Sequence, residues 1–211
     1  MSEITIKRLN EKIKKDPMGT VAASEKRYKE LIEQIADKVA RDNNIRIILL
    51  AGPSGSGKTT SANLISDKIT KSGKKCLVVS LDDFYRDATD PEYPRFENGE
   101  RDYEAPGALD IPYLVKTLDD IANERPFTLP KYDFKVGGRV SVTKHSAMAG
   151  GCVVIEGLHA LNPIVYEQLP KKSVFKIFIS VSTNITSGGV RLISGRKMRF
   201  VKAHCIRLYR F

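Results

Sequence analysis

The sequence has few cysteines and no apolar stretch long enough to cross a bilayer. Residues 1–15 carry charges among few apolar residues, which argues against a signal peptide and predicts a cytoplasmic protein that does not bind a membrane. The three cysteines, Cys76, Cys152 and Cys205, lack the spacing of a metal site. Because Cys76 and Cys152 each open an apolar run, we expect both to be small buried residues.

Acidic residues are absent beyond Glu167, although the whole chain of 211 residues has 25 of them. The formal net charge of +10 therefore comes entirely from the basic residues that follow Glu167, and residues 1–167 are balanced. A basic segment can bind the phosphates of a nucleotide, a nucleic acid or a membrane surface, or form a solvated face. Charge alone does not decide between these possibilities. We do not expect nucleic acid as a partner.

Internal repeats and low-complexity tracts are also absent, and the apolar pattern predicts alternating helices and strands. We expect an N-terminal arm over residues 1–23 and one domain over residues 24–211, beginning with an amphipathic helix that Ser24 caps. Further helices are predicted from the end of the glycine-rich segment to about Ser72 and over residues 109–123, with a β-hairpin over residues 127–143. Buried strands are predicted at residues 45–51, 76–80, 152–157 and 174–180. This order predicts a three-layer α/β fold, in which helices cover both faces of a parallel sheet and the hairpin is a small insertion.

The most informative segment is GPSGSGKTT at residues 52–60, directly after an apolar run. This is the pattern of a phosphate-binding loop (P-loop) between a strand and a helix, in which glycines let backbone N–H groups turn toward a phosphate. Lys58 adds a charge that reaches the β- and γ-phosphates, and Thr59 offers a hydroxyl to Mg²⁺. The competing interpretation is a turn that binds nothing. The pattern favours ATP and Mg²⁺ as cofactors, bound by Gly52, Ser54, Gly55, Ser56, Gly57, Lys58, Thr59 and Thr60.

Carboxylates follow two of the predicted strands. Asp82 and Asp83 come just after residues 76–80, and Glu156 ends the run at residues 152–156. Ligands of parallel sheets bind beyond the carboxyl ends of the strands, so we expect all three acids to face the crevice that holds Lys58 and Thr59. Such acids can hold a metal and accept the proton of an attacking hydroxyl, as phosphoryl transfer requires. Each could also be a turn, cap or solvated strand-end residue.

Four further segments resemble conserved blocks of uridine kinases in the uridine kinase and phosphoribulokinase superfamily. These are SLDDFYR at residues 80–86, NGERDYE at 98–104 with ALD at 108–110, LPKYDF at 129–134 and VIEGLHALNP at 154–163. With the P-loop, their order and spacing match the family from about residue 28 to residue 180. The resemblance implies a nucleoside kinase that transfers phosphate from ATP to a 5′-hydroxyl, with uridine or cytidine as substrate. The oligomeric state stays open, a homo-oligomer included.

The resemblance also implies roles for individual residues. Asp82 would be the catalytic base, with Lys58 and Arg199 as the other catalytic residues, and Thr59, Glu156 and Asp82 would hold Mg²⁺. Aromatic rings stack on bases and acids bind ribose hydroxyls, which agrees with a substrate pocket of this composition. Tyr132 and Phe134 could instead form ordinary hairpin core, and for Phe134 this alternative is at least as well supported. The implied substrate-binding residues are Asp82, Tyr85, Glu104, Tyr132, Phe134, Arg139 and His159.

Two features depart from the family pattern. Gly137 stands where better-known uridine kinases have a histidine that helps to read the pyrimidine. Residues 191–202 resemble the start of the arginine-bearing lid, but the sequence ends at Phe211, so we expect the C-terminal part of the family fold to be missing. Two alternatives therefore stay open, a kinase of another small alcohol and a weak or inactive binder of ATP or nucleic acid. A GTPase is disfavoured, because no Asn-Lys-x-Asp stretch is present.

Overall fold

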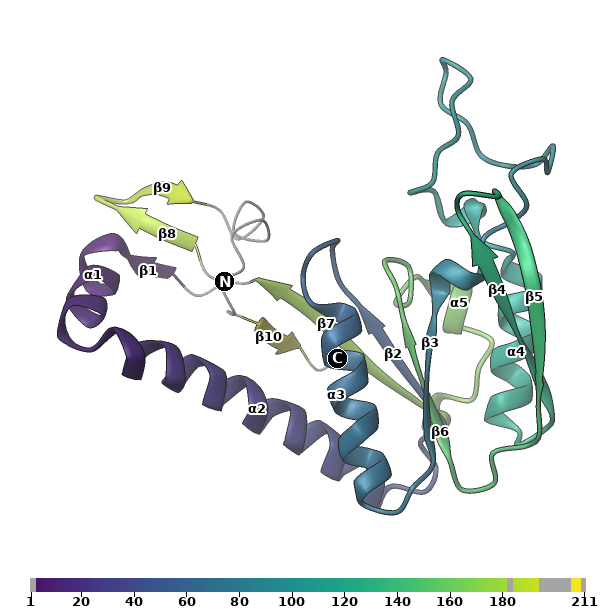
Figure 1. Cartoon of the computed structure of the whole chain (residues 1–211), viewed down its shortest axis with the longest axis horizontal. Helices are drawn as coiled ribbons and strands as arrows, with labels where there is room; N and C mark the ends of the chain where they lie inside the picture. The colour runs from purple at the N-terminus through teal and green to yellow at the C-terminus, as the bar shows by residue number, and fades with distance from the viewer. Residues whose placement is uncertain (1–2, 182–183, 194–205, 210–211) are drawn as a thin grey trace.

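The structure is a computed structural model and describes residues 3–181, 184–193 and 206–209 (Figure 1). The strands form a 3-stranded, a 5-stranded and a 2-stranded sheet, and the helices flank these sheets. The helices are α1 (Ile6–Lys15), α2 (Pro17–Arg41), α3 (Lys58–Lys71), α4 (Ile111–Ala122) and α5 (Pro163–Tyr166), with short 3₁₀ helices η1 (Leu81–Phe84), η2 (Pro106–Ala108) and η3 (Lys171–Ser173). The strands are β1 (Glu3–Thr5), β2 (Ile47–Ala51), β3 (Cys76–Ser80), β4 (Phe127–Asp133), β5 (Gly138–His145), β6 (Cys152–Glu156), β7 (Val174–Val181), β8 (Asn184–Ser187), β9 (Val190–Ile193) and β10 (Ile206–Tyr209).

The central sheet confirms the predicted α/β fold. Its strand order is β10-β7-β2-β6-β3, with β7, β2, β6 and β3 parallel and β10 antiparallel at one edge. Because the four parallel strands have their carboxyl ends at one edge, the residues that follow β2, β3 and β6 are brought together there. The four strands expected from apolar runs are all present, whereas β10 and the small β1-β8-β9 sheet are additions that the pattern did not indicate.

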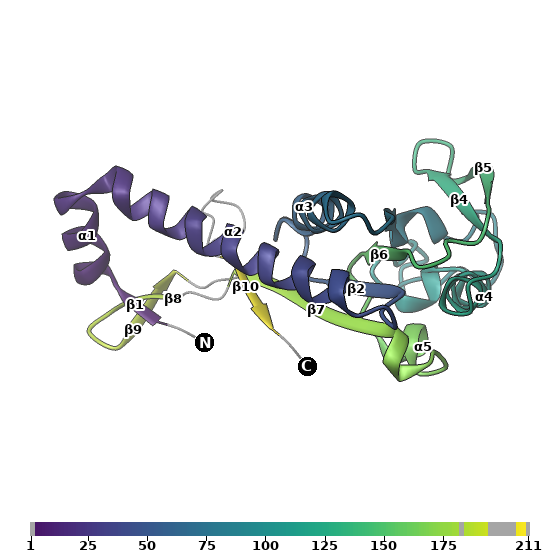
Figure 2. The same ribbon diagram turned by 90° about the horizontal axis from the view of Figure 1, so that it is seen from below.

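One face of the sheet is covered by α2 and α3 (Figure 2). Ile48 and Leu50 of β2 point to this side, as does Cys152 of β6. Cys152 lies opposite Cys76 in the β3–β6 register and is fully buried, while Cys76 is half-buried. The expectation of small core cysteines is confirmed for Cys152 and partly for Cys76; Cys205 lies outside the described residues.

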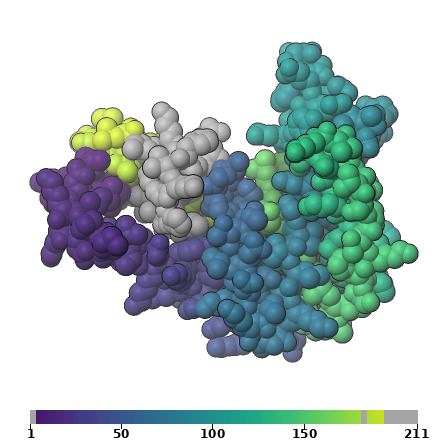
Figure 3. Space-filling view, viewed as in Figure 1, coloured from purple at the N-terminus to yellow at the C-terminus, as the bar shows by residue number. Residues whose placement is uncertain are grey.

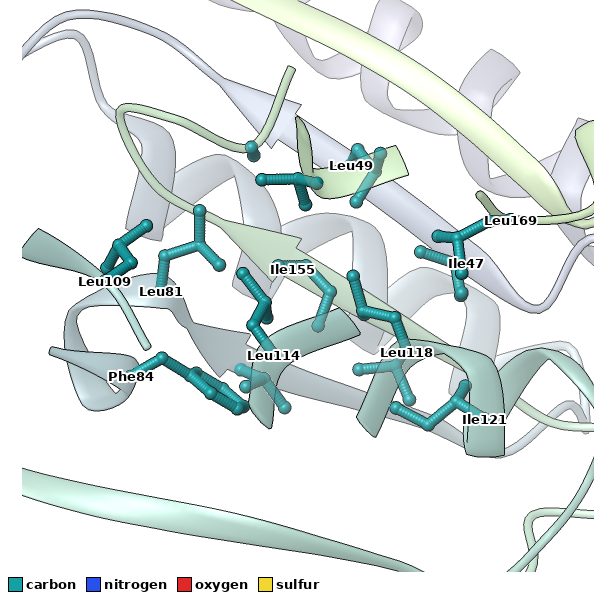
Figure 4. Packing of buried hydrophobic residues seen from close by; sticks show 14 of the residues in the cluster. Ile47, Leu49, Leu81, Phe84, Leu109, Leu114, Leu118, Ile121, Ile155 and Leu169 are labelled. Atoms are coloured by element: carbon teal, nitrogen blue, oxygen red, sulfur yellow. The ribbon is translucent and has the colours of Figure 1, made fainter. Parts of the chain in front are cut away.

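The opposite face is covered by α4 and α5 (Figure 4). Ile47 and Leu49, the alternate residues of β2, point to this side and meet Leu114 and Leu118 of α4, so both faces of the central strand are apolar. Asp110 caps α4 by accepting from the backbone N–H of Tyr113 at 3.2 Å, which places the start of the helix close to the predicted position.

The expected start of the first long helix is wrong. α2 begins at Pro17 and not near Ser24, and its N-cap is Asp16, whose Oδ1 accepts from the N–H of Gly19 at 2.8 Å. Proline is favoured in the first turn of a helix because its missing N–H is not needed there, so Pro17 starts the helix instead of breaking it. α2 consequently extends beyond the central sheet. α1 lies at its far end, next to the small sheet in which β1 pairs with β8 (Figure 1).

The β4–β5 hairpin is present as predicted and extends to His145. Together with the segment at residues 86–107 it forms a lobe at one end of the molecule, and Figure 3 shows a notch between this lobe and the body that carries α3. The resemblance to a lid begins at Arg191, which lies in β9, and Arg199 lies outside the described residues. None of the helices in the described ranges is long and apolar enough to cross a membrane.

Candidate active site

The P-loop between β2 and α3 has the backbone that its glycines predict. Gly55 and Gly57 have φ angles of 72° and 87°, a left-handed conformation that residues with a Cβ rarely adopt. Gly52 is required for lack of space, because the Cβ of any other residue there would lie 2.3 Å from the backbone oxygen of Ile179. The loop therefore passes close to β7 before it turns, and the glycines are required by its shape.

The start of α3 offers donors to an anion. Gly57 is the N-cap and contributes no side chain, so the first N–H groups of a 14-residue helix are not capped by a side chain. The hydroxyl of Ser56 is buried and has no hydrogen-bond partner among the described residues. The ammonium of Lys58 donates to the backbone oxygen of Pro53 at 3.2 Å, which folds it back over the loop. Uncapped N–H groups, an unpaired hydroxyl and a lysine fit a phosphate group.

Thr59 and Glu156 meet at the carboxyl edge of the sheet. The Thr59 hydroxyl donates to Glu156 Oε1 at 3.1 Å, and Glu156 is only 6% exposed. Glu156 lies between Leu50 and Ser80 in the register of β2-β6-β3, directly beside the strand that leads into the P-loop. A hydroxyl and a carboxylate are oxygen ligands of the kind that Mg²⁺ binds together with phosphate oxygens and water.

The carboxylates do not form a metal cage by themselves. Across the described part of the chain, no group of three or more His, Cys, Asp and Glu side chains is suited to hold a metal ion. This donor set fits Mg²⁺ delivered with a nucleotide, because Mg²⁺ usually keeps waters and phosphate oxygens as most of its ligands.

Asp82 and Asp83 point to different places, which corrects the expectation that both face the crevice. The carboxylate of Asp83 binds the ammonium of Lys131 at 2.9 Å and accepts from the N–H of Tyr132 at 3.4 Å, so it fastens η1 to the hairpin. The residues lie in a 3₁₀ helix, where successive side chains are about 120° apart, and both cannot face one side. Only Asp82 is left to face the P-loop.

Asp82 is exposed to solvent, although nearby protein partly desolvates its carboxyl. Burial raises the pKa of its carboxyl, the charge of Lys58 opposes this shift, and the nearby Asp83 adds to it. His159 also lowers the pKa of Asp82, so both Lys58 and His159 lie close enough for their charges to act on it. Within the described ranges no donor is hydrogen-bonded to the Asp82 carboxylate. The group is held near the P-loop and is available to a ligand.

Aromatic rings gather beside Asp82. Tyr85 lies 5.2 Å from Phe134 and 5.8 Å from Tyr132 between ring centroids, and its hydroxyl donates to the backbone oxygen of Tyr103 at 2.7 Å. Tyr132 is 5% exposed and Phe134 is 54% exposed. Hairpin core, the alternative considered for both residues, therefore describes the buried Tyr132 and not the exposed Phe134.

The polar residues of the predicted pocket are only partly brought together. The ring Nε2 of His159 lies 2.8 Å from the backbone oxygen of Glu104, which joins the segment after β6 to the lobe. Glu104 itself is exposed. Arg139, in contrast, binds Asp110 at 3.0 Å and lies over the ring of Tyr113, so its guanidinium is engaged at the start of α4.

Two tyrosines next to this cluster were not predicted as site residues. Tyr103 contacts Tyr85 and Phe134, and Tyr93 contacts Tyr103, at centroid distances of 6.3, 6.5 and 5.7 Å. Both belong to the polar segment at residues 86–107. Tyr103 also lies in the block at residues 98–104 that resembles the family, whereas only the length of the segment could have indicated Tyr93.

Comparisons with known proteins identify the family of this chain. The profile of the "Phosphoribulokinase / Uridine kinase family" matches residues 47–189, which include the P-loop, Asp82 and Glu156. Proteins named uridine kinase from Deinococcus deserti and Bacillus subtilis are both 32% identical, over 139 and 115 residues; the aligned parts are 66% and 54% of this chain and 63% and 52% of those proteins. The chain thus spans less than two thirds of their length.

Among solved structures, that of a possible uridine kinase from Bacillus stearothermophilus superposes with a TM-score of 0.50 at 21% identity, covering 64% of this chain and 70% of that one. This likeness shows the fold. From the family match over residues 47–189, and the P-loop and strand-end carboxylates within it, the chain belongs to the phosphoribulokinase/uridine kinase family.

Proposed function

We propose that this protein transfers the γ-phosphate of ATP to the 5′-hydroxyl of a pyrimidine nucleoside, uridine or cytidine, giving the nucleoside monophosphate and ADP. The observation that carries the proposal is the position of Asp82. Its carboxylate has no hydrogen-bond partner in the described ranges and senses the charge of Lys58, while Asp83 beside it is committed to Lys131. An unpaired carboxylate next to a phosphate site is what a hydroxyl acceptor requires.

In this proposal the P-loop backbone, the start of α3 and Lys58 hold the triphosphate. Thr59 and Glu156 would hold Mg²⁺, and Asp82, whose pKa responds to the charge of Lys58, would join them. When bound, Mg²⁺ neutralises charge on the β- and γ-phosphates. Asp82 accepts the hydroxyl proton at its carboxylate, and Lys58 stabilises the charge that grows on the transferred group.

The acceptor would lie against the aromatic residues beside Asp82. The exposed face of Phe134 and the ring of Tyr85 can stack on a base, and Glu104 can accept a hydrogen bond from a ribose hydroxyl. His159 supports this arrangement because its contact with the backbone oxygen of Glu104 holds the lobe near the P-loop. The sequence implied that Arg139 binds the substrate. We assign it a smaller role in substrate binding, because its guanidinium is already paired with Asp110.

An acceptor panel tests the proposal. With the 211-residue chain, ATP and Mg²⁺, we expect ADP release that depends on uridine or cytidine and is weaker with purine nucleosides, ribose or pantothenate. The panel includes non-nucleoside alcohols because Gly137 stands in place of the base-reading histidine. If one of them stimulates ADP release more strongly than uridine or cytidine, it replaces the nucleoside as the proposed acceptor. ATP binding without any acceptor-dependent ADP release would instead support a binding protein.

The pH dependence of the reaction gives a second prediction. A base acts when deprotonated, so activity should rise as pH increases through the pKa of Asp82. Burial raises this pKa, and we therefore expect the acid limb of kcat/KM to lie at higher pH than an ordinary aspartate would give. The measurement is kcat/KM for the acceptor from acid to neutral pH. An acid limb at or below the ordinary aspartate value would contradict the burial of this carboxyl in the working enzyme.

A further inference from the structure

A chain of hydrogen bonds connects α2 to the P-loop. Tyr28 is the first buried residue of α2, where this helix packs against α3 (Figure 1). Its hydroxyl lies 2.8 Å from the hydroxyl of Ser61 in α3, and the Ser61 hydroxyl donates to the backbone oxygen of Gly57 at 2.8 Å. Tyr28 is 8% exposed and Ser61 is fully buried, so both hydroxyls are shielded from water. A helix that is not part of the P-loop pattern thus reaches the N-cap of α3.

The chain of bonds has one direction. A serine hydroxyl carries a single proton, and that of Ser61 is directed at the Gly57 oxygen, so the Tyr28 hydroxyl donates to Ser61. Burial raises the pKa of Tyr28, and its phenol therefore keeps the proton that it donates. A hydroxyl that accepts one hydrogen bond donates a stronger one. Tyr28 thus strengthens the bond from Ser61 to Gly57 and holds the Ser61 side chain in the rotamer that makes it.

Gly57 is the residue through which these bonds can act on a nucleotide. Its backbone oxygen also accepts from the N–H of Ser61 at 2.9 Å, so two donors hold it in place. The peptide unit that joins Gly57 to Lys58 is planar and trans, and the Lys58 N–H therefore points opposite to this oxygen. Lys58 is the first residue of α3, where no side chain caps the helix and N–H groups are free to bind a phosphate. Holding the Gly57 oxygen thus aims a donor at the phosphate site.

We propose that Tyr28 is a positioning residue for ATP, which acts through Ser61 and Gly57 to hold the Lys58 N–H in the direction that the triphosphate requires. The inference deepens the proposed function and rests on its phosphate donor, ATP, but not on the identity of the acceptor. If the same bonds served only the packing of α2 on α3, their loss would lower stability and leave the affinity for ATP unchanged. The two roles therefore differ in a measurable quantity.

The test is Tyr28→Phe, which keeps the ring in the core and removes only the hydroxyl. We expect the dissociation constant of MgATP in calorimetry, and KM for ATP, to rise about two- to tenfold, the range to which the net free energy of one hydrogen bond converts. KM for the acceptor should stay unchanged, because the chain of bonds ends at the P-loop. Ser61→Ala breaks the same chain at its second link and should weaken MgATP binding by a similar factor. In the double variant the two losses should not add, since either substitution alone already breaks the chain.

Tyr113→Phe is the matched control. The Tyr113 hydroxyl lies 2.8 Å from the hydroxyl of Thr128, so the substitution removes a bond of the same kind in α4, on the other face of the sheet. We expect it to leave the dissociation constant of MgATP unchanged. An equal loss of affinity in Tyr113→Phe and Tyr28→Phe would overturn the inference, because affinity would then follow general stability.

The outcomes also separate this inference from the proposed function. Unchanged MgATP binding in Tyr28→Phe, or additive losses in the double variant, would overturn the role of Tyr28, while uridine-dependent ADP release by the unmodified chain would leave the proposed function intact. If the unmodified chain binds MgATP but no acceptor stimulates ADP release, weaker binding in Tyr28→Phe still supports the role of Tyr28. If it binds no MgATP at all, both proposals fail.

Discussion

Replacing Asp82 with asparagine is expected to lower kcat for acceptor-dependent ADP release by about 10²–10⁴-fold, the contribution typical of a positioned general base. Asparagine keeps the size of the side chain and its place in η1 but cannot accept the hydroxyl proton. ATP affinity should change little, because Lys58 and the P-loop backbone form the triphosphate site without Asp82. Steady-state kinetics with saturating ATP, together with an equilibrium measurement of nucleotide binding, checks both parts of this prediction.

Asp83→Asn is the matched control for this experiment. It makes the same chemical change at the neighbouring residue, where the carboxylate is paired with Lys131 and with the N–H of Tyr132. We expect it to affect the hairpin and hence KM for the acceptor, with kcat within a few-fold of the unmodified chain. A larger loss of kcat in Asp83→Asn than in Asp82→Asn would reverse the assignment of the two residues, and unchanged turnover in Asp82→Asn would remove the base from the mechanism.

The second large effect concerns stability. Phe84→Ala should lower the free energy of unfolding by about 3–5 kcal/mol, the usual result of truncating a fully buried aromatic side chain. Phe84 is 0% exposed, lies 5.6 Å from the ring of Tyr113 between centroids and packs under α4 with Leu81 and Leu109 (Figure 4). Because folded proteins are stabilised by only about 5–15 kcal/mol, this loss should be plain in urea-induced unfolding.

Phe134→Ala provides the comparison within the same residue type. Its ring is 54% exposed and contacts the other aromatic residues of the lobe, so we expect a stability loss well below that of Phe84→Ala. Equal losses at the two positions would mean that the lobe is packed as tightly as the core under α4. Phe84 also lies two residues after Asp82 in η1, so a loosened core should lower turnover in the Phe84 variant even at temperatures where it stays folded.

The parts of the fold that sequence predicted share one property, a strong local signal. β2, β3 and β6 are apolar runs buried between two layers of helices, and the P-loop has glycines whose conformations no other residue adopts easily. The hairpin was indicated by its Gly137-Gly138 turn. Where the local signal was ambiguous the prediction failed. Pro17 can end a chain segment or begin a helix, and in the structure it begins α2, with Asp16 as the N-cap.

By itself the sequence determined that this chain has a P-loop, that carboxylates follow two strands of a parallel sheet, and that the family is that of the phosphoribulokinases and uridine kinases. Only the tertiary structure decided that Asp82 and not Asp83 faces the P-loop, that Tyr132 is buried while Phe134 is exposed, and that Tyr93 joins them. The reason is physical. The direction of each of these side chains depends on partners tens of residues away, such as Lys131 for Asp83, and such contacts leave no mark on the local pattern of residues.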